Sequence, residues 1–141
     1  MFKRILVPLD GSKLAEAVLP HVKELAKIHG SELLLLRVAF SHPLPGVDPI
    51  KDQTEVVEEA LSYLADLEKE LKREGLRASS AVRYGRAAEE ILDHAKDNQV
   101  DIIAMSTHGR SGISRLVLGS VSEHVLRYAS VPVLLVRSHA A

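Results

Sequence analysis

Residues 101–120 read Asp101-Ile102-Ile103-Ala104-Met105-Ser106-Thr107-His108-Gly109-Arg110-Ser111-Gly112-Ile113-Ser114-Arg115-Leu116-Val117-Leu118-Gly119-Ser120. The run 101–105 is apolar after its first residue and is typical of a central strand, whereas the sequence after Gly119 is typical of a helix. Glycines and hydroxyl side chains join the two. A backbone built in this way can hold a phosphate group, because the first N–H groups of a helix have no partner within it.

Short apolar runs alternate with helical periodicities along the rest of the chain. This pattern predicts repeated strand–helix units around a mostly parallel sheet, and therefore the α/β class. Five strands are expected, at about residues 3–8, 32–38, 78–84, 101–105 and 132–136. Four helices are expected, at about 13–29, 51–74, 87–95 and 120–129. With no repeat or linker in the sequence, residues 1–141 are expected to form one domain.

Three local features qualify these expectations. Pro20 lies inside the first expected helix, where it should remove a backbone hydrogen bond and bend the axis. The strand at 78–84 is polar enough to lie at an edge of the sheet. The segment 39–50 carries several prolines and is expected to be a surface connection.

Composition excludes several classes of protein. The chain has 18 basic and 19 acidic residues, a net charge of -1, 4% aromatic residues and no Trp, so it lacks the basic surface and the stacking platforms of a nucleic-acid reader. Cysteine is absent, which removes disulfides and thiolate chemistry. The apolar N-terminal run is too short for a signal peptide and no run is long enough to span a membrane, so a cytoplasmic protein is expected.

The carboxyl ends of the first and fourth strands are where a parallel α/β sheet would bind a ligand. Asp10 and Ser106 lie at these two ends. If the two strands are neighbours, the loops that follow them flank one crevice, and Val38 at the end of the second strand lies close by.

Residue types in these loops suit a phosphorylated ligand. Gly109 and Gly119 let main-chain N–H groups approach a phosphate, and Ser120 can add its hydroxyl at a helix start. Arg110 and Arg115 could neutralise charge. Asp10 could accept hydrogen bonds from ribose hydroxyls or bind a divalent ion. Met105 and Val38 are of a kind that could sandwich an adenine.

Purely structural interpretations remain open for the same residues. The sequence Ser120-Val121-Ser122-Glu123 fits a capping box, in which Ser120 and Glu123 cover each other's backbone amides. Glu123 could instead pair with Arg127, four residues later on the helix. Asp10 could be a turn residue, and Met105 and Val38 could belong to the core.

Several sharper motifs are absent. No Lys lies between Gly109 and Ser120, so the loop is not a G-x-x-x-x-G-K-[ST] phosphate loop, and no G-x-G-x-x-G turn follows the first strand. Ser111 lacks the G-x-S-x-G context of a hydrolase nucleophile. The seven His residues show no metal-binding spacing, and His108 is expected to be a hydrogen-bonding or packing residue.

The sequences 5–12, 105–109, 118–121 and 131–136 together give the chain a resemblance to the universal stress protein family over essentially its whole length. The ATP-binding branch of that family has the pattern Gly, two residues, Gly, nine residues, Gly and then Ser or Thr. Gly109, the nine residues after it and Gly119-Ser120 match this pattern, whereas Ser106 replaces the first glycine. The Ser106 Cβ would lie where the backbone approaches ribose or phosphate.

The resemblance implies a doubly wound, five-stranded parallel sheet of order 3-2-1-4-5 with four helices on both faces. It implies that Asp10 contacts the ribose or adenine side, that Pro8, Val38 and Met105 wall the base pocket, and that Gly109, Arg110, Gly119, Ser120 and Val121 hold the phosphates. Leu9 and Ser106 are expected to belong to the same nucleotide site. It also implies a homodimer. The last strand agrees, because an edge strand with the apolar run 133–136 needs a cover, and a second copy would supply one.

The leading hypothesis is therefore a stress-response protein that binds ATP with Mg²⁺, with Asp10 the candidate metal ligand, and that changes the dimer and partner contacts on binding. Its protein partners are not identified by the sequence. Two alternatives stay open: a dimeric interaction module of the same fold that binds no nucleotide, and a slow ATP hydrolase. Efficient phosphoryl transfer would lack a phosphate-loop Lys and a water-positioning residue.

Overall fold

The five expected strands form one sheet in the computed structural model, which describes residues 1–40, 45–109 and 118–138. The strands are β1 (Arg4–Leu9), β2 (Glu32–Ala39), β3 (Arg77–Tyr84), β4 (Ile102–Ser106) and β5 (Val133–Val136). Their order is β3-β2-β1-β4-β5, and every neighbouring pair is parallel. Sheet order and class are therefore confirmed, and β3 is an edge strand, as its polar sequence predicted.

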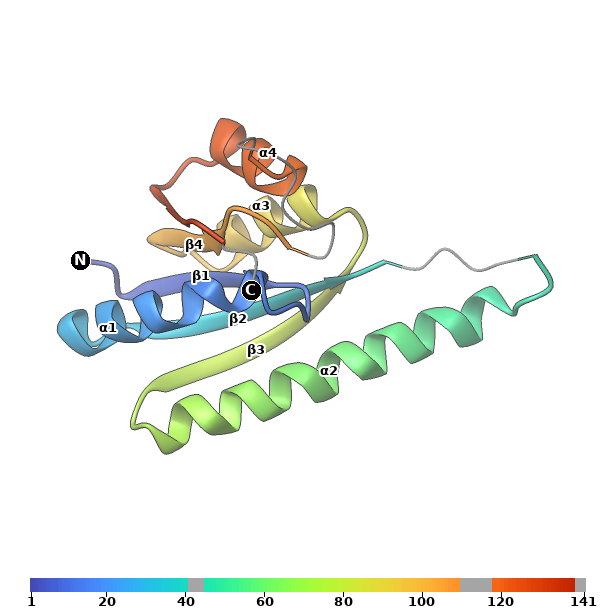
Figure 1. Ribbon diagram of the computed structural model, residues 1–141, viewed down its shortest axis with the longest axis horizontal. Helices are drawn as coiled ribbons and strands as arrows, with labels where there is room; N and C mark the ends of the chain where they lie inside the picture. Colours follow the sequence, from blue (N-terminus) through green and yellow to red (C-terminus); the bar gives the residue numbers. More distant parts are fainter. Residues whose placement is uncertain (41–44, 110–117, 139–141) are drawn as a thin grey trace.

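Helices cover both faces of the sheet (Figure 1). The α-helices are α1 (Leu19–His29), α2 (Pro49–Arg73), α3 (Ala87–Asp97) and α4 (Ser120–Tyr128), and a 3₁₀-helix, η1 (Ala15–Val18), precedes α1. One core cluster joins the sheet to α1 and α2, with Val22, Leu64 and Leu71 buried in it. The other joins the opposite face to α3 and α4 through Ile91 and Val125. In the described part of the chain, no helix is both long and apolar enough to cross a bilayer.

Pro20 does not kink a helix, and this expectation was wrong. The chain from residue 15 forms η1 first, and α1 begins only at Leu19, so Pro20 lies in the first turn of α1. A proline there removes no helical hydrogen bond, because the N–H groups of the first turn have no acceptor within the helix. The apolar periodicity continues through η1 and α1, so the sequence predicted one helix where the structure has two.

The central position of β1 creates the ligand edge. β1 pairs with β2 on one side, in the register from Arg4 with Glu32 to Leu9 with Arg37, and with β4 on the other. The chain moves outward from β1 in both directions, so the order of the sheet reverses between β1 and β4. The loops that leave these two strands diverge, and a crevice opens at their carboxyl ends.

Candidate functional site

A cavity of about 850 Å³ lies at this carboxyl edge. Eleven residues were predicted to form a site, and ten of them line the cavity: Pro8, Leu9, Asp10, Val38, Met105, Ser106, Gly109, Gly119, Ser120 and Val121. The eleventh, Arg110, lies outside the described residues, as does Arg115. The fold thus brings together segments that are far apart in the sequence, from the ends of β1, β2 and β4 and from the start of α4.

Asp10 follows β1 and is fixed by the turn that it begins. Its Oδ1 accepts hydrogen bonds from the Ser12 N–H at 2.9 Å and from the Ser12 hydroxyl at 2.6 Å. The Ser12 Oγ in turn accepts a hydrogen bond from the Ala15 N–H at 3.1 Å, which stabilises the start of η1. The structural role expected for Asp10 is therefore confirmed. The role does not exclude ligand contacts, because Asp10 also lines the cavity.

Only glycine fits at position 109, because the backbone there lies close to the Asp10 carboxylate. A Cβ on Gly109 would lie 2.1 Å from the Asp10 Oδ2 and 3.1 Å from its Cγ, far inside normal contact distance. The loop after β4 therefore passes directly over the carboxylate of the loop after β1. The absence of a side chain at residue 109 brings the two loops together.

Gly119 makes the second close approach, to the backbone of Thr107. Its N–H donates to the Thr107 carbonyl at 3.0 Å, and a Cβ at residue 119 would lie 2.7 Å from that oxygen. This clash would be with backbone, which cannot rotate out of the way as a side chain can. The spacing of the two glycines thus reflects two close approaches, one to a carboxylate and one to a carbonyl.

The start of α4 presents amides that have no acceptor within the helix. The capping box predicted for Ser120 is wrong: the N-cap is Gly119, whose carbonyl accepts the Glu123 N–H at 2.9 Å, and no side chain caps the helix. Ser120 is the first helical residue and is exposed. The N–H groups of Ser120, Val121 and Ser122 precede the first helical hydrogen bond and have no acceptor within the helix, so this turn favours an anion.

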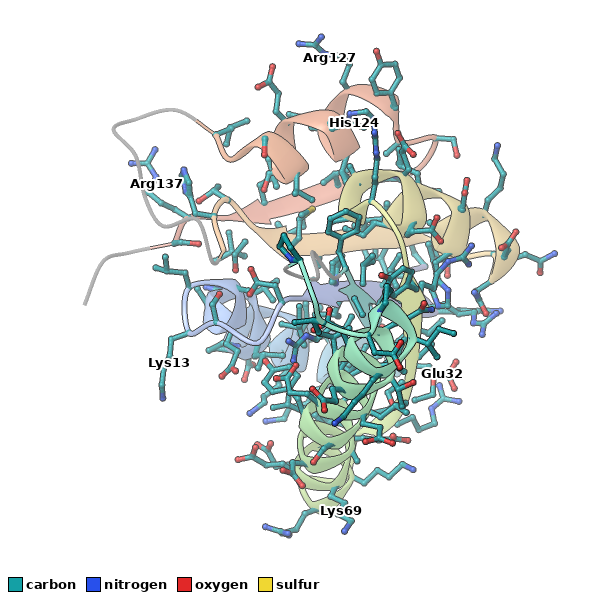
Figure 2. All side chains as sticks on the ribbon, turned by 90° about the vertical axis from the view of Figure 1, so that its right-hand side faces the viewer. Lys13, Glu32, Lys69, His124, Arg127 and Arg137 are labelled. Carbon is teal, nitrogen blue, oxygen red and sulfur yellow. The ribbon has the colours of Figure 1, made fainter. Side chains whose placement is uncertain are left out.

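Glu123 does not oppose an anion at that position directly. Its carboxylate accepts a hydrogen bond from Arg127 at 2.9 Å, which confirms the expected ion pair. Arg127 points away from the sheet (Figure 2). The acidic group of the first turn is therefore neutralised on the outer side of α4.

Ser106, which stands where the family pattern has glycine, is built into the cavity wall. It is 5% exposed, and its hydroxyl donates to the Ala15 carbonyl at 2.7 Å. Its own carbonyl accepts the hydroxyl of the buried Ser122 at 2.9 Å. Ser106 thus ties the end of β4 to η1 on one side and to α4 on the other.

A second buried hydroxyl comes from the segment after β5. Ser138 is 4% exposed, and its N–H donates to the Thr107 Oγ1 at 3.0 Å. Its Oγ lies 3.1 Å from the Leu14 carbonyl and 3.2 Å from the His108 carbonyl, within donor range of both, and accepts the His108 N–H at 3.3 Å. The exit of β5 is thereby fastened to the loop that carries Gly109. Nothing in the sequence alone related residue 138 to this loop.

On the far side of the sheet, polar contacts connect η1 to α2. Arg37 is 5% exposed, and its guanidinium binds both carboxylate oxygens of Glu59, at 3.0 and 2.6 Å, and lies 5.1 Å from the Tyr63 ring centroid. The Tyr63 hydroxyl donates to Glu16 at 2.6 Å. Burial, and then this hydrogen bond to a carboxylate, raise the pKa of Tyr63 above its usual range. The phenol therefore stays protonated and keeps η1 attached to α2.

Sequence reasoning missed other lining residues, namely Ala15, Leu36, Phe40, Ala87, Ile91, Thr107, His108 and Ser122. Some had a usable signal. Leu36, Val38 and Phe40 are two residues apart, so they share one face of β2 and its extension. Ala87 and Ile91 are four apart and share one face of α3.

The chain matches known proteins over nearly its full length. The model of the universal stress protein family matches residues 1–137. Universal stress protein MJ0577 of Methanocaldococcus jannaschii is 32% identical over 155 residues, covering 97% of this chain and 96% of that protein. Universal stress protein YxiE of Bacillus subtilis is 32% identical over 148 residues, covering 97% of this chain and 100% of that protein.

Solved structures agree with the sequence relatives. The structure of MJ0577 matches with a TM-score of 0.86 at 33% identity, covering 100% of this chain and 99% of that one. A universal stress protein in complex with cAMP matches with a TM-score of 0.71 at 21% identity, covering 98% of both chains. A family member from Arabidopsis thaliana with AMP bound matches with a TM-score of 0.70 at 17% identity, covering 98% and 93%. The last two likenesses show the fold alone. On the family model and these relatives, the chain belongs to the universal stress protein family.

Proposed function

We propose that this protein binds an adenine nucleotide, ATP with Mg²⁺, in the cavity at the carboxyl edge of the sheet. The observation that carries the proposal is that Gly109, Gly119 and the first turn of α4 lie together at the same cavity. Both glycine Cβ positions are already occupied, by the Asp10 Oδ2 at 2.1 Å and by the Thr107 oxygen at 2.7 Å, so residues 109 and 119 both lie tightly against the backbone or side chains at the cavity wall. Ser120, Val121 and Ser122, whose amides have no acceptor within α4, line the same cavity.

The two ends of the cavity differ in chemistry, and this difference supports an orientation. The end at Gly109, Ser120 and Val121 offers backbone N–H groups and a hydroxyl, which suit phosphate. The opposite end is lined by apolar side chains of β2, β4 and α3, with Val38 and Met105 among them, which suit a base. Asp10, whose carboxylate lies against Gly109, would face the ribose next to the phosphates, because a carboxylate can accept hydrogen bonds from ribose hydroxyls.

Known relatives are consistent with an adenine-containing ligand. The solved family members noted above carry cAMP and AMP, both of which share the adenosine group with ATP. A ligand of this class would fit the apolar end and the polar end of the cavity at the same time.

Magnesium would enter with the nucleotide. Among the described residues, no group of three or more His, Cys, Asp or Glu side chains is placed to hold a metal ion. Phosphate oxygens would therefore supply most ligands of the ion, with Asp10 as the candidate protein ligand, in keeping with the preference of Mg²⁺ for oxygen.

We infer binding rather than turnover as the main activity. In the part of the cavity wall that the structure describes, Asp10 is the one carboxylate and no lysine is present. Phosphoryl transfer needs groups that neutralise the developing charge and position the attacking water. Two alternatives remain testable: a slow hydrolase that uses Asp10, and an interaction module that binds no nucleotide.

We also propose a homodimer through β5. This strand is the second edge of the sheet, and its residues Val133–Val136 are all partly exposed. A groove of about 520 Å³ beside it is lined by apolar side chains that include Leu134, Phe2 and Ile28, and Ile28 is 73% exposed. A second copy that paired along β5 would remove the strand edge and cover part of the groove. Sedimentation equilibrium tests this proposal: a dimer that Val133→Lys converts to a monomer supports it, and a wild-type monomer contradicts it.

Isothermal titration calorimetry with ATP at millimolar Mg²⁺ tests the nucleotide proposal. Saturable heat is expected for the wild type and none for Gly119→Val, because the larger side chain meets the Thr107 carbonyl. Equal heat for both proteins, or no heat for the wild type, would refute the proposal. Nucleotide released by heating the purified protein separates the alternatives: ATP supports a binder, AMP or ADP formed with turnover supports an enzyme, and no nucleotide supports the interaction module.

A further inference from the structure

Phe40 is a large aromatic side chain at the mouth of the candidate nucleotide cavity. It follows β2 directly, lines the cavity and is 51% exposed. A large exposed apolar side chain on a cavity wall loses contact with water when a ligand enters, and it therefore contributes to binding.

The position of Phe40 follows from strand periodicity. Leu36, Val38 and Phe40 are successive residues on one face of β2 and its extension, and all three line the cavity. Leu36 is fully buried, Val38 is partly buried and Phe40 is exposed. The three form an apolar strip that runs from the core of the sheet to the cavity mouth, so Phe40 extends the wall begun by Val38.

Tyr84 holds the Phe40 ring from β3. The two rings are stacked, with centroids 6.4 Å apart and planes 28° apart. β2 and β3 stay paired up to this point, because Ala39 is in register with Tyr84 and the Gly85 N–H donates to the Ala39 carbonyl at 3.0 Å. An aromatic ring stacked in this way loses little conformational freedom on binding a ligand.

We propose that Phe40, backed by Tyr84, is a stacking subsite for the nucleobase. The inference rests on the proposed function, because the phosphate end at α4 directs the base toward the apolar end where Phe40 lies. A planar base in contact with Phe40 would gain stacking in addition to apolar contact. Stacking depends on the base and not on the phosphates, so the subsite contributes equally to the binding of ATP and of AMP.

Four proteins test the subsite by calorimetry with ATP and with AMP: wild type, Phe40→Ala, Phe40→Tyr and Tyr128→Ala. Tyr128 is the matched control, since it is an aromatic residue 62% exposed on α4 and does not line the cavity. Phe40→Ala is expected to raise the dissociation constant about tenfold for both nucleotides. Phe40→Tyr keeps the ring and should stay within about twofold of wild type, as should Tyr128→Ala.

The outcomes separate the two proposals. If wild type binds both nucleotides and Phe40→Ala stays within about twofold of it, the subsite is refuted and the proposed function stands. If Phe40→Tyr binds as weakly as Phe40→Ala, ring stacking is refuted as the cause. If wild type binds neither nucleotide, the proposed function fails and the subsite fails with it. Because Phe40 is half exposed, the alanine variant should fold, and its circular dichroism spectrum should match that of wild type.

Discussion

Gly109→Ala should weaken nucleotide binding by displacing Asp10. The added Cβ would lie 2.1 Å from the Asp10 Oδ2, so the carboxylate must retreat by more than about 1 Å to reach normal contact. Asp10 is held by two hydrogen bonds from Ser12, at 2.9 and 2.6 Å, and retreat strains or breaks both. Hydrogen bonds to a charged group contribute about 1.5–3 kcal/mol each, but water replaces part of this around a partly exposed carboxylate such as that of Asp10.

The free energy of unfolding should therefore fall by about 1–3 kcal/mol, as measured by urea denaturation. The affinity for ATP should fall at least about tenfold, because Asp10 leaves the ribose region. Gly75→Ala is the control: Gly75 has φ of +84° with nothing within 4 Å of its Cβ position, and it lies between α2 and β3. It should lose stability through backbone strain and keep wild-type affinity.

A double-mutant cycle isolates the cause. If the clash with the Asp10 carboxylate is responsible, Gly109→Ala should lower stability much less in an Asp10→Ala background than in wild type. Unchanged ATP affinity of Gly109→Ala, or an equal loss of stability in both backgrounds, would refute the reasoning.

Three other perturbations follow from described contacts. Burial, and then Arg83 at 3.3 Å from the His94 Nδ1, lower the pKa of His94, while Asp97 acts in the opposite direction. The unfolded state therefore binds a proton more readily than the folded state, and the stability present above pH of about 6.5 should be lost as pH falls toward the folded pKa. Urea denaturation at pH of about 7.5 and 5.5 should show this loss in the wild type and not in His94→Gln. Glu59→Ala leaves the buried Arg37 without its carboxylate and should lower the unfolding free energy by about 1–3 kcal/mol, with Arg37→Met in the same chain recovering most of it; no recovery would contradict the ion-pair explanation. Ser138→Ala should lower it by about 1–2 kcal/mol and speed amide exchange at residues 107–109, and unchanged exchange would contradict the role given to Ser138.

Most of the fold could be predicted because the hydrophobic periodicity and the positions of Gly and Pro residues indicate the same helices and strands. The apolar run of β1 reads as a buried strand, and its residues Ile5, Leu6 and Val7 are fully buried. The polar run of β3 reads as an edge strand, and it is one. Prediction failed at Pro20, since periodicity continues across the junction of η1 and α1 and cannot show where the hydrogen-bonding pattern changes.

The candidate site was predictable where residue type and spacing mark it, and unpredictable where it depends on contacts between distant segments. Gly109 and Gly119 stand out by their spacing. The role of Ser138 depends on hydrogen bonds to residues about thirty and more than a hundred positions earlier, which no local pattern encodes. The capping box at Ser120 was wrong because its sequence fits two registers one residue apart, and α4 takes the earlier start, with Gly119 as N-cap and its N–H bonded to the Thr107 carbonyl.

Titration of ¹⁵N-labelled protein with ATP and Mg²⁺ tests the central claim most directly, since it reports on the backbone amides proposed to hold the phosphates. The signals of Gly109, Ser120 and Val121 should shift in a saturable manner, and AMP should shift the Val38 signal as strongly as ATP does. Absence of any shift, or shifts confined to the groove beside β5, would contradict nucleotide binding at the carboxyl edge of the sheet.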